Sequence, residues 1–361
     1  MKRLPLIILC VILLCGTLAH AEDDDIFKRQ YNALELDSLT RQSPQNIEIK
    51  KDISLDSGLS ALFKSLLGQI GGVFKKGLSC ITIIIAIAVL TAIIKSMYNT
   101  GSKAVPVCIS AVSAVAVTAA AAGSITTLIG MGQSAIEGMN VFSKSLLPTL
   151  AASITATGAP LGGAARYAAT VMFSDIIITL INTVLMPLVY TYIAAATANA
   201  ALEDASLSKI TDFLHWIVTG SLKILIGVFV FYITVSGIIA STTDVVGAKT
   251  ARFALNGAVP VVGGILSDAA GTVIAGAMAI KNSIGIFGML TILSICLTPF
   301  LTIAVNYFLF RAAAALTSPI CDERISGLVE RIGTGFGVVF GMTASCALLF
   351  FVSILSCMFA V

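Results

Sequence analysis

Long apolar segments alternate with short polar gaps over most of this chain. Eight such segments can be marked, at residues 78–94, 104–131, 146–165, 176–201, 224–243, 255–280, 283–310 and 332–361. A helix needs about 20 predominantly apolar residues to cross the hydrocarbon core of a bilayer. The pattern therefore predicts an all-α protein, a polytopic integral membrane helical bundle formed by residues 77–361.

The chain begins with the pattern of a secretory signal peptide, which we assign to residues 1–21. Lys2 and Arg3 precede a short apolar stretch at residues 4–14, and a cleavage pattern of small residues ends at Ala21. An uncleaved signal anchor is the alternative. Both interpretations place the residues that follow outside the cytoplasm.

Residues 22–76 form an extended polar segment that we expect on the extracytoplasmic side. Apolar residues recur at helical spacing toward its end, at Leu59, Leu62, Phe63, Leu66, Leu67, Ile70, Val73 and Phe74. This spacing predicts an amphipathic helix. Such a helix lies either at the membrane surface or against the protein's own extracytoplasmic face, and the sequence leaves both open.

Lys and Arg residues are distributed unequally between the gaps that successive crossings place on opposite sides. With the amino end outside, the inner gaps hold Lys95, Lys103, Arg166, Lys249, Arg252, Arg311, Arg324 and Arg331. The outer gaps hold Lys144, Lys209, Lys223 and Lys281, with the acidic residues Glu137, Glu203, Asp204 and Asp212. Because cytoplasmic loops carry an excess of positive charge, the bias favours eight crossings with the carboxyl terminus outside. If residues 146–165 or 255–280 do not cross, every later loop changes sides.

The composition agrees with a membrane protein and argues against a soluble enzyme. Hydrophobic residues make up 57% of the chain and charged residues 11%, with a mean hydropathy of +0.99, whereas soluble domains carry about 25% charged residues. A net charge of +3 is too small to indicate a nucleic-acid partner. The cysteines and histidines show no metal-binding spacing, and the chain has no Walker motif. We expect no metal, no cofactor and no catalytic site.

The strongest candidate for a functional or structural motif lies in the segment 255–280. It comprises Pro260, Gly263, Gly264, Ser267 and Asp268. The proline removes a backbone donor and the two glycines weaken the helix beside it. An ionisable residue inside a span is costly, so Asp268 is a functional hypothesis by default. The alternative is that the serine and the aspartate cap a half-helix that starts after the break.

A similar arrangement occurs earlier in the chain. It comprises Pro160, Gly162, Gly163, Arg166 and Asp175. Matched breaks in two halves are typical of transporters built from internal repeats around a central site, although chance also explains a match of one proline and two glycines. We expect residues 146–165 and 255–280 to form broken or re-entrant helices near a central cavity, because irregular backbone at membrane depth must be buried or face water.

The order of these features resembles the stage III sporulation protein AE family. The most specific stretch is Val-Pro-Val-Val-Gly-Gly-Ile-Leu-Ser-Asp-Ala at residues 259–269. Further resemblance lies at residues 145–150 with Gly158, at 186–188, at 285–288, and at 311–316 with Pro319 and Ile320. The resemblance extends over about residues 55–361.

This resemblance implies a multipass protein of the mother-cell membrane that surrounds the engulfed forespore in an endospore-forming bacterium. It implies as partners the lipid bilayer, the other stage III A sporulation proteins, including an ATPase and ring-forming proteins, and the forespore stage II protein Q. Together such proteins form a secretion-like channel between mother cell and forespore. The resemblance supplies no catalytic residues.

Three other functions stay open from the residues alone. A self-sufficient secondary transporter of a small solute would need no partner, but the chain lacks the several intramembrane charges that such coupling often uses. An intramembrane enzyme would need paired catalytic groups at membrane depth, for which Asp175 and Asp268 are the acidic candidates. A structural scaffold for ring assembly would use the many small residues for packing.

Overall fold

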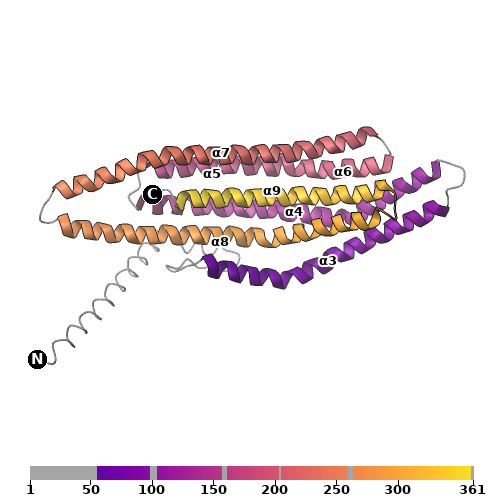
Figure 1. Cartoon of the computed structure of the whole chain (residues 1–361), viewed down its shortest axis with the longest axis horizontal. Coiled ribbons are helices and arrows are strands. Elements are labelled where there is room, and N and C mark those ends of the chain that lie inside the picture. The colour runs from indigo at the N-terminus through magenta and orange to yellow at the C-terminus, as the bar shows by residue number, and fades with distance from the viewer. Residues whose placement is uncertain (1–54, 98–103, 157–160, 203–204, 259–262, 359–361) are drawn as a thin grey trace, which may run out of the picture.

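The computed structural model describes residues 55–97, 104–156, 161–202, 205–258 and 263–358, and every long regular element in these ranges is a helix. The elements are α3 (Leu55–Met97), α4 (Ala104–Ala156), α5 (Leu161–Leu180), the π-helix η1 (Ile181–Leu185), α6 (Met186–Leu202), α7 (Ala205–Ala258), α8 (Gly263–Thr317) and α9 (Glu323–Met358). They lie side by side in an elongated bundle (Figure 1). The predicted all-α fold is confirmed, while the predicted signal peptide lies outside the described residues.

Six helical stretches in the described part of the chain are long and apolar enough to cross a membrane. They are Gly58–Met97, Val105–Leu150, Met172–Leu202, Ser206–Thr234, Met278–Thr317 and Glu323–Leu355. The helices α4, α7 and α8 contain 53, 54 and 55 residues. At 1.5 Å per residue each is roughly 80 Å long, against about 30 Å for the hydrocarbon core. These three helices therefore extend beyond the hydrocarbon, and the six stretches fit a multi-pass membrane protein.

The helix boundaries differ from the eight predicted segments because several predicted gaps lie inside continuous helices. Residues 132–145 belong to α4, and residues 281–282 belong to α8. The predicted amphipathic helix and the first apolar segment form the single helix α3. Its first half packs on α8, where Thr298 Oγ1 donates a hydrogen bond of 3.2 Å to Gln69 Oε1. Leu62 of this stretch is buried, whereas Phe63, Leu67 and Phe74 are exposed, so the choice between the two placements stays a prediction.

Helix ends coincide with both predicted interruptions. One interruption separates α4 from α5 between Ala156 and Leu161, and the other separates α7 from α8 between Ala258 and Gly263. The chain reverses direction at each, so α4 is antiparallel to α5 and α7 is antiparallel to α8 (Figure 1). The proline–glycine sequences therefore separate neighbouring antiparallel helices.

Small residues allow close contact between the central helices α4, α8 and α9. A Cβ atom on Gly132 of α4 would lie 2.6 Å from Val339 Cγ1 of α9, and one on Gly288 of α8 would lie 2.6 Å from Leu146 Cδ2 of α4. Helices in lipid associate through such close packing, because lipid tails are as apolar as the side chains they would replace. The small residues of the sequence therefore serve packing within the chain as well as any outer surface.

The last turn of α3, the first turns of α7 and the turn between α8 and α9 meet at one end of the bundle (Figure 1). Arg331 Nη2 of α9 lies 3.3 Å from Asp212 Oδ1 of α7, and Lys95 of α3 forms an ion pair with Asp322. The charge count placed Asp212 and Arg331 on opposite sides of the membrane. That assignment is wrong, because residues 244–254 and 281–282, which it counted as loops, lie within α7 and α8. The chain therefore crosses twice, and not three times, between Asp212 and Arg331.

A labelling experiment tests this shared end. We expect Cys321 and an introduced Lys209→Cys to react with a membrane-impermeant maleimide from the same side, in chains that carry no other cysteine. Burial raises the pKa of the Cys321 thiol, and only the thiolate reacts. Its labelling rate should therefore be low at neutral pH and rise at alkaline pH. Labelling of the two positions from opposite sides would contradict the fold.

Candidate functional site on the outer face of α4

Four polar side chains form a row along one side of α4. They are Gln133, Glu137, Asn140 and Lys144. Spacings of three and four residues place side chains on the same face of an α-helix. The row is therefore a product of helical geometry, and it lies in the helix that the sequence analysis divided at this point.

The row lies at the depth of uncharged stretches in two neighbouring helices. A Cβ atom on Gly138 would lie 3.3 Å from Ile295 Cγ2 of α8, and Gly132 faces Val339 of α9. Residues 282–310 of α8 and 332–358 of α9 contain no Asp, Glu, Lys or Arg. Because an uncharged stretch of that length marks the hydrocarbon region, Glu137 lies near the middle of the membrane-spanning depth.

The far end of the row is paired with α5. Lys144 Nζ lies 2.7 Å from Asp175 Oδ1, and Asn140 Nδ2 donates a hydrogen bond of 3.1 Å to the same oxygen. Charges inside a span usually pair with one another. Asp175 is thus the predicted site residue that the structure places in a defined contact.

The π-helix η1 faces the near end of the row. Pro187, in the first turn of α6, has no backbone N–H, and the Met186 N–H instead bonds to the Ile181 carbonyl, five residues back. This wide turn explains η1, and π-helical turns often occur at functional sites. It carries Asn182, whose Oδ1 is buried and has no hydrogen-bond partner among the described residues.

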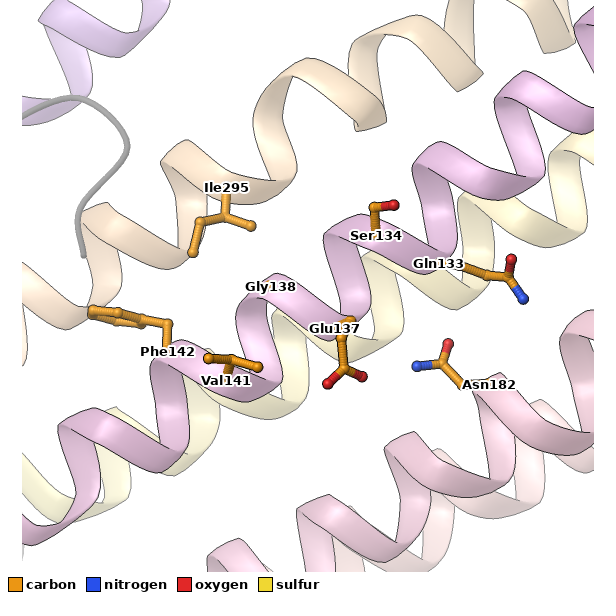
Figure 2. A pocket seen from close by; sticks show the side chains of 8 residues that line it. All are labelled: Gln133, Ser134, Glu137, Gly138, Val141, Phe142, Asn182 and Ile295. Atoms are coloured by element: carbon orange, nitrogen blue, oxygen red, sulfur yellow. The ribbon is translucent and has the colours of Figure 1, made fainter.

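Together these elements form a groove, here called the α4 groove, with a volume of about 850 Å³. Its lining consists of Gln133, Ser134, Glu137, Gly138, Val141, Phe142, Asn182 and Ile295. The side chains of Glu137 and Asn182 extend toward each other across it (Figure 2). Glu137 and Ser134 are exposed on the outer surface of the bundle. The groove therefore combines a few polar side chains with apolar ones at membrane depth and opens away from the core.

A second cavity, of about 1280 Å³ and with a mainly polar lining, lies at the end of the bundle where α3, α7 and α9 meet. Its charged lining residues form ion pairs between helices, including Lys95 with Asp322 and Arg331 with Asp212. We interpret this cavity as a water-accessible end that the ion pairs hold together. No group of three His, Cys, Asp or Glu side chains suited to a metal ion occurs in the ranges that the structure describes.

Most of the predicted site residues lie where their side chains are not described. Pro160 and Pro260 are outside the described residues. The first turns of α8 contain Gly263, Gly264, Ser267 and Asp268, and the first turns of α5 contain Gly162, Gly163 and Arg166. The side chains of Ser267, Asp268 and Arg166 lie outside the described set, so the predicted role of Asp268 stays a prediction.

Sequence reasoning missed two features of the site. The polar row was assigned to a gap outside the membrane, although the positions of Gln133, Glu137, Asn140 and Lys144 already followed helical spacing. Lys281 was assigned to a second outer gap, whereas it lies within α8 with 2% of its surface exposed. Hydropathy alone cannot distinguish a loop from a polar stretch within a long helix.

A bundle of long apolar helices that carries polar side chains at membrane depth defines the class of multi-pass helical membrane proteins. Within that class, the chain belongs to the stage III sporulation protein AE family, whose model matches residues 45–360. The chain is also 26% identical over 234 residues to the stage III sporulation protein AE of Bacillus subtilis (strain 168). That match covers 65% of this chain and 59% of the relative. No solved structure matches the chain. The resemblance noted in the sequence is confirmed.

Proposed function

We propose that this chain is a membrane-embedded subunit of a sporulation-specific, secretion-like transport complex between mother cell and forespore. Membership in the family supports a role in sporulation. The proposed partners are the other stage III A proteins, including an ATPase and ring-forming proteins, and the forespore stage II protein Q. The proposed location is the mother-cell membrane around the forespore, with the amino end extracytoplasmic after signal cleavage. The role proposed for the chain is not catalytic.

One observation carries the subunit role: Glu137 is exposed on the outer face of α4 near the middle of the membrane-spanning depth. A carboxylate that faced lipid there would cost about 2.5–3.5 kcal/mol on insertion scales. In a bundle that acts alone, lipid would surround this carboxylate and no contact would offset the cost. Contact with another subunit, or with water enclosed between subunits, removes it.

The centre of the bundle supports the same conclusion. Large apolar side chains fill it at the level of the groove, and Ile129, Met186, Phe336 and Val339 each have 0% of their surface exposed. A self-sufficient secondary transporter needs a polar site inside the chain that opens alternately to the two sides. The described charged side chains along this part of α4 and α5, Glu137, Lys144 and Asp175, are instead exposed or partly exposed at the outer face, which favours a pathway formed between subunits.

Replacing Glu137 with leucine tests the proposal, because leucine is preferred wherever the surface faces lipid. We expect heat-resistant spore formation to fall by roughly tenfold or more, at an unchanged protein level in the membrane, when the variant is the sole copy. Val115→Leu on the same outer face of α4 is the control and should sporulate normally. A normal spore yield for the Glu137→Leu variant would show that sporulation does not need the carboxylate in the groove and would contradict the proposal.

A further inference from the structure

Two exposed charges of opposite sign lie on separate helices at similar depth. Glu137 lies on α4 and Lys223 lies on α7, in the middle of the span Ser206–Thr234. Neither side chain forms an ion pair with another described residue. An unpaired lysine at membrane depth is about as costly as an unpaired carboxylate. Both surfaces are therefore expected to contact protein or enclosed water and not lipid.

Contacts with α9 establish the relative depth. Gly132 of α4 faces Val339 and Thr343 of α9, and a Cβ atom on Gly341 would lie 3.8 Å from Leu222 Cδ2 of α7. Lys223 therefore lies level with the first residues of the α4 groove, and Glu137 lies about one helical turn, 5.4 Å, further along. The flexible four-carbon stem of lysine spans that distance.

The two charges cannot meet within one chain, because α5 and α6 separate α4 from α7. Thr118 of α4 lies 3.0 Å from Thr197 of α6, measured between the hydroxyl oxygens. On the other side of this layer, Phe173 of α5 stacks on Phe229 of α7 with ring centroids 6.2 Å apart. The outer faces of α4 and α7 therefore belong to different sides of the bundle.

The shapes of the two faces are complementary as well. Beside its groove, the outer face of α4 carries the small residues Ala119, Gly123 and Thr127, and no atom lies within 4 Å of a Cβ placed on Gly123. The outer face of α7 carries the stacked rings of Phe213 and Trp216, which are 57% and 67% exposed. Helices in lipid pack where small residues admit a neighbour.

These large and small residues lie at the same depth. Thr118 pairs with Thr197, and since α4 and α6 are antiparallel, Gly123 lies level with Tyr192. The Tyr192 ring lies 5.8 Å from the ring of His215, the residue before Trp216. The large side chains of α7 therefore lie at the same depth as the small residues of α4. At their own depth, Lys223 and Glu137 carry opposite charges.

We infer that the outer face of α4 binds the outer face of α7 of a second copy of this chain, with Glu137 of one copy paired with Lys223 of the next. Because the two faces differ, the contact is heterologous and joins copies head to tail. Repetition of such a contact in the plane of a membrane produces a ring when the rotation closes. The inference rests on the proposed role as a subunit and names the partner of the α4 groove.

Disulfide crosslinking in native membranes tests this contact. Two tagged, otherwise cysteine-free chains are coexpressed, one with Thr127→Cys on α4 and one with Gly220→Cys on α7, and the membranes are oxidised. We expect a disulfide-linked dimer that contains both tags. Glu137→Lys in the chain with Thr127→Cys, or Lys223→Glu in the chain with Gly220→Cys, should each reduce the dimer roughly fivefold or more through like-charge contact. Both reversals together should restore it.

The control is Lys64→Glu on α3, an exposed charge reversal away from both faces that should leave the dimer unchanged. Absence of the dimer between unreversed chains at normal protein levels, or failure of the paired reversals to restore it, would overturn the inference. If the dimer is absent while Glu137→Leu still blocks spore formation, the partner is another protein and the proposed function stands. If the dimer forms while Glu137→Leu sporulates normally, self-assembly stands and the proposed function fails.

Discussion

A Gly132→Val variant should unfold at a clearly lower temperature than the parent protein. A Cβ atom at this position would lie 2.6 Å from Val339 Cγ1, 3.4 Å from Thr343 Oγ1 and 3.5 Å from Met186 Cε. Three helical elements meet there, so no single side chain can move aside without disturbing another. Overpacking of this kind costs about 3 kcal/mol, which lowers the unfolding temperature by roughly 5–10 °C in a protein of this size.

Gly130→Val provides the matched control for this prediction. Gly130 lies in the same helix, and no atom lies within 4 Å of a Cβ placed on it. Valine is a better helix former than glycine, so this variant should be as stable as the parent. The measurement is thermal unfolding of both purified variants in the same detergent. Equal unfolding temperatures would show that α4 does not pack against α9 as described.

Breaking the Lys144–Asp175 pair should be more harmful than removing it. In Asp175→Asn, Lys144 keeps its charge and loses the carboxylate 2.7 Å away. Removing one partner leaves an uncompensated charge, and at membrane depth this costs about 2.5–3.5 kcal/mol. We expect the single variant to accumulate poorly in the membrane and to sporulate poorly.

The double variant Lys144→Met, Asp175→Asn should recover much of the loss, because it leaves no charge to solvate. Both side chains are partly exposed, at 51% and 38%, and the pair would contribute little if that surface faced water. The comparison of single and double variants therefore also shows whether the exposed part of the pair faces water: a small loss in the single variant indicates water, and a large loss indicates lipid or protein. Strictly additive losses would mean that the two charges do not interact.

Local chemistry in the sequence predicted the fold class and the two interruptions. Charge-free apolar stretches indicated membrane helices, and the Pro-Gly sequences around Pro160 and Pro260 coincide with the places where helices end. Both signals act over a few residues, since a missing N–H or a missing Cβ weakens a helix whatever lies beside it. These apolar stretches and helix-breaking residues can be recognised in the sequence without knowing which helices pack beside them.

The functional surface could not be predicted in the same way, because it depends on depth and on packing between helices. In the sequence, residues 133–144 have the polar character of a loop. Their place within the bundle follows only from the packing of α4 against the uncharged stretches of α8 and α9. The contact between Asn140 and Asp175 joins two helices across a reversal of the chain. The pairing of Glu137 with a second copy depends on the outer surfaces of α4 and α7, which no pattern along one helix reveals.

The most direct test of this account is the accessibility of residue 137. In a chain whose only cysteine is Glu137→Cys, we expect no reaction with a membrane-impermeant maleimide from either side of intact membranes, and rapid reaction after the protein is dissolved in detergent. That result would place the polar row of α4 at membrane depth, in contact with another subunit that shields it from the reagent. Rapid labelling from outside intact cells would show that residues 133–144 form an external loop, and it would contradict both the fold of α4 and the site built on it.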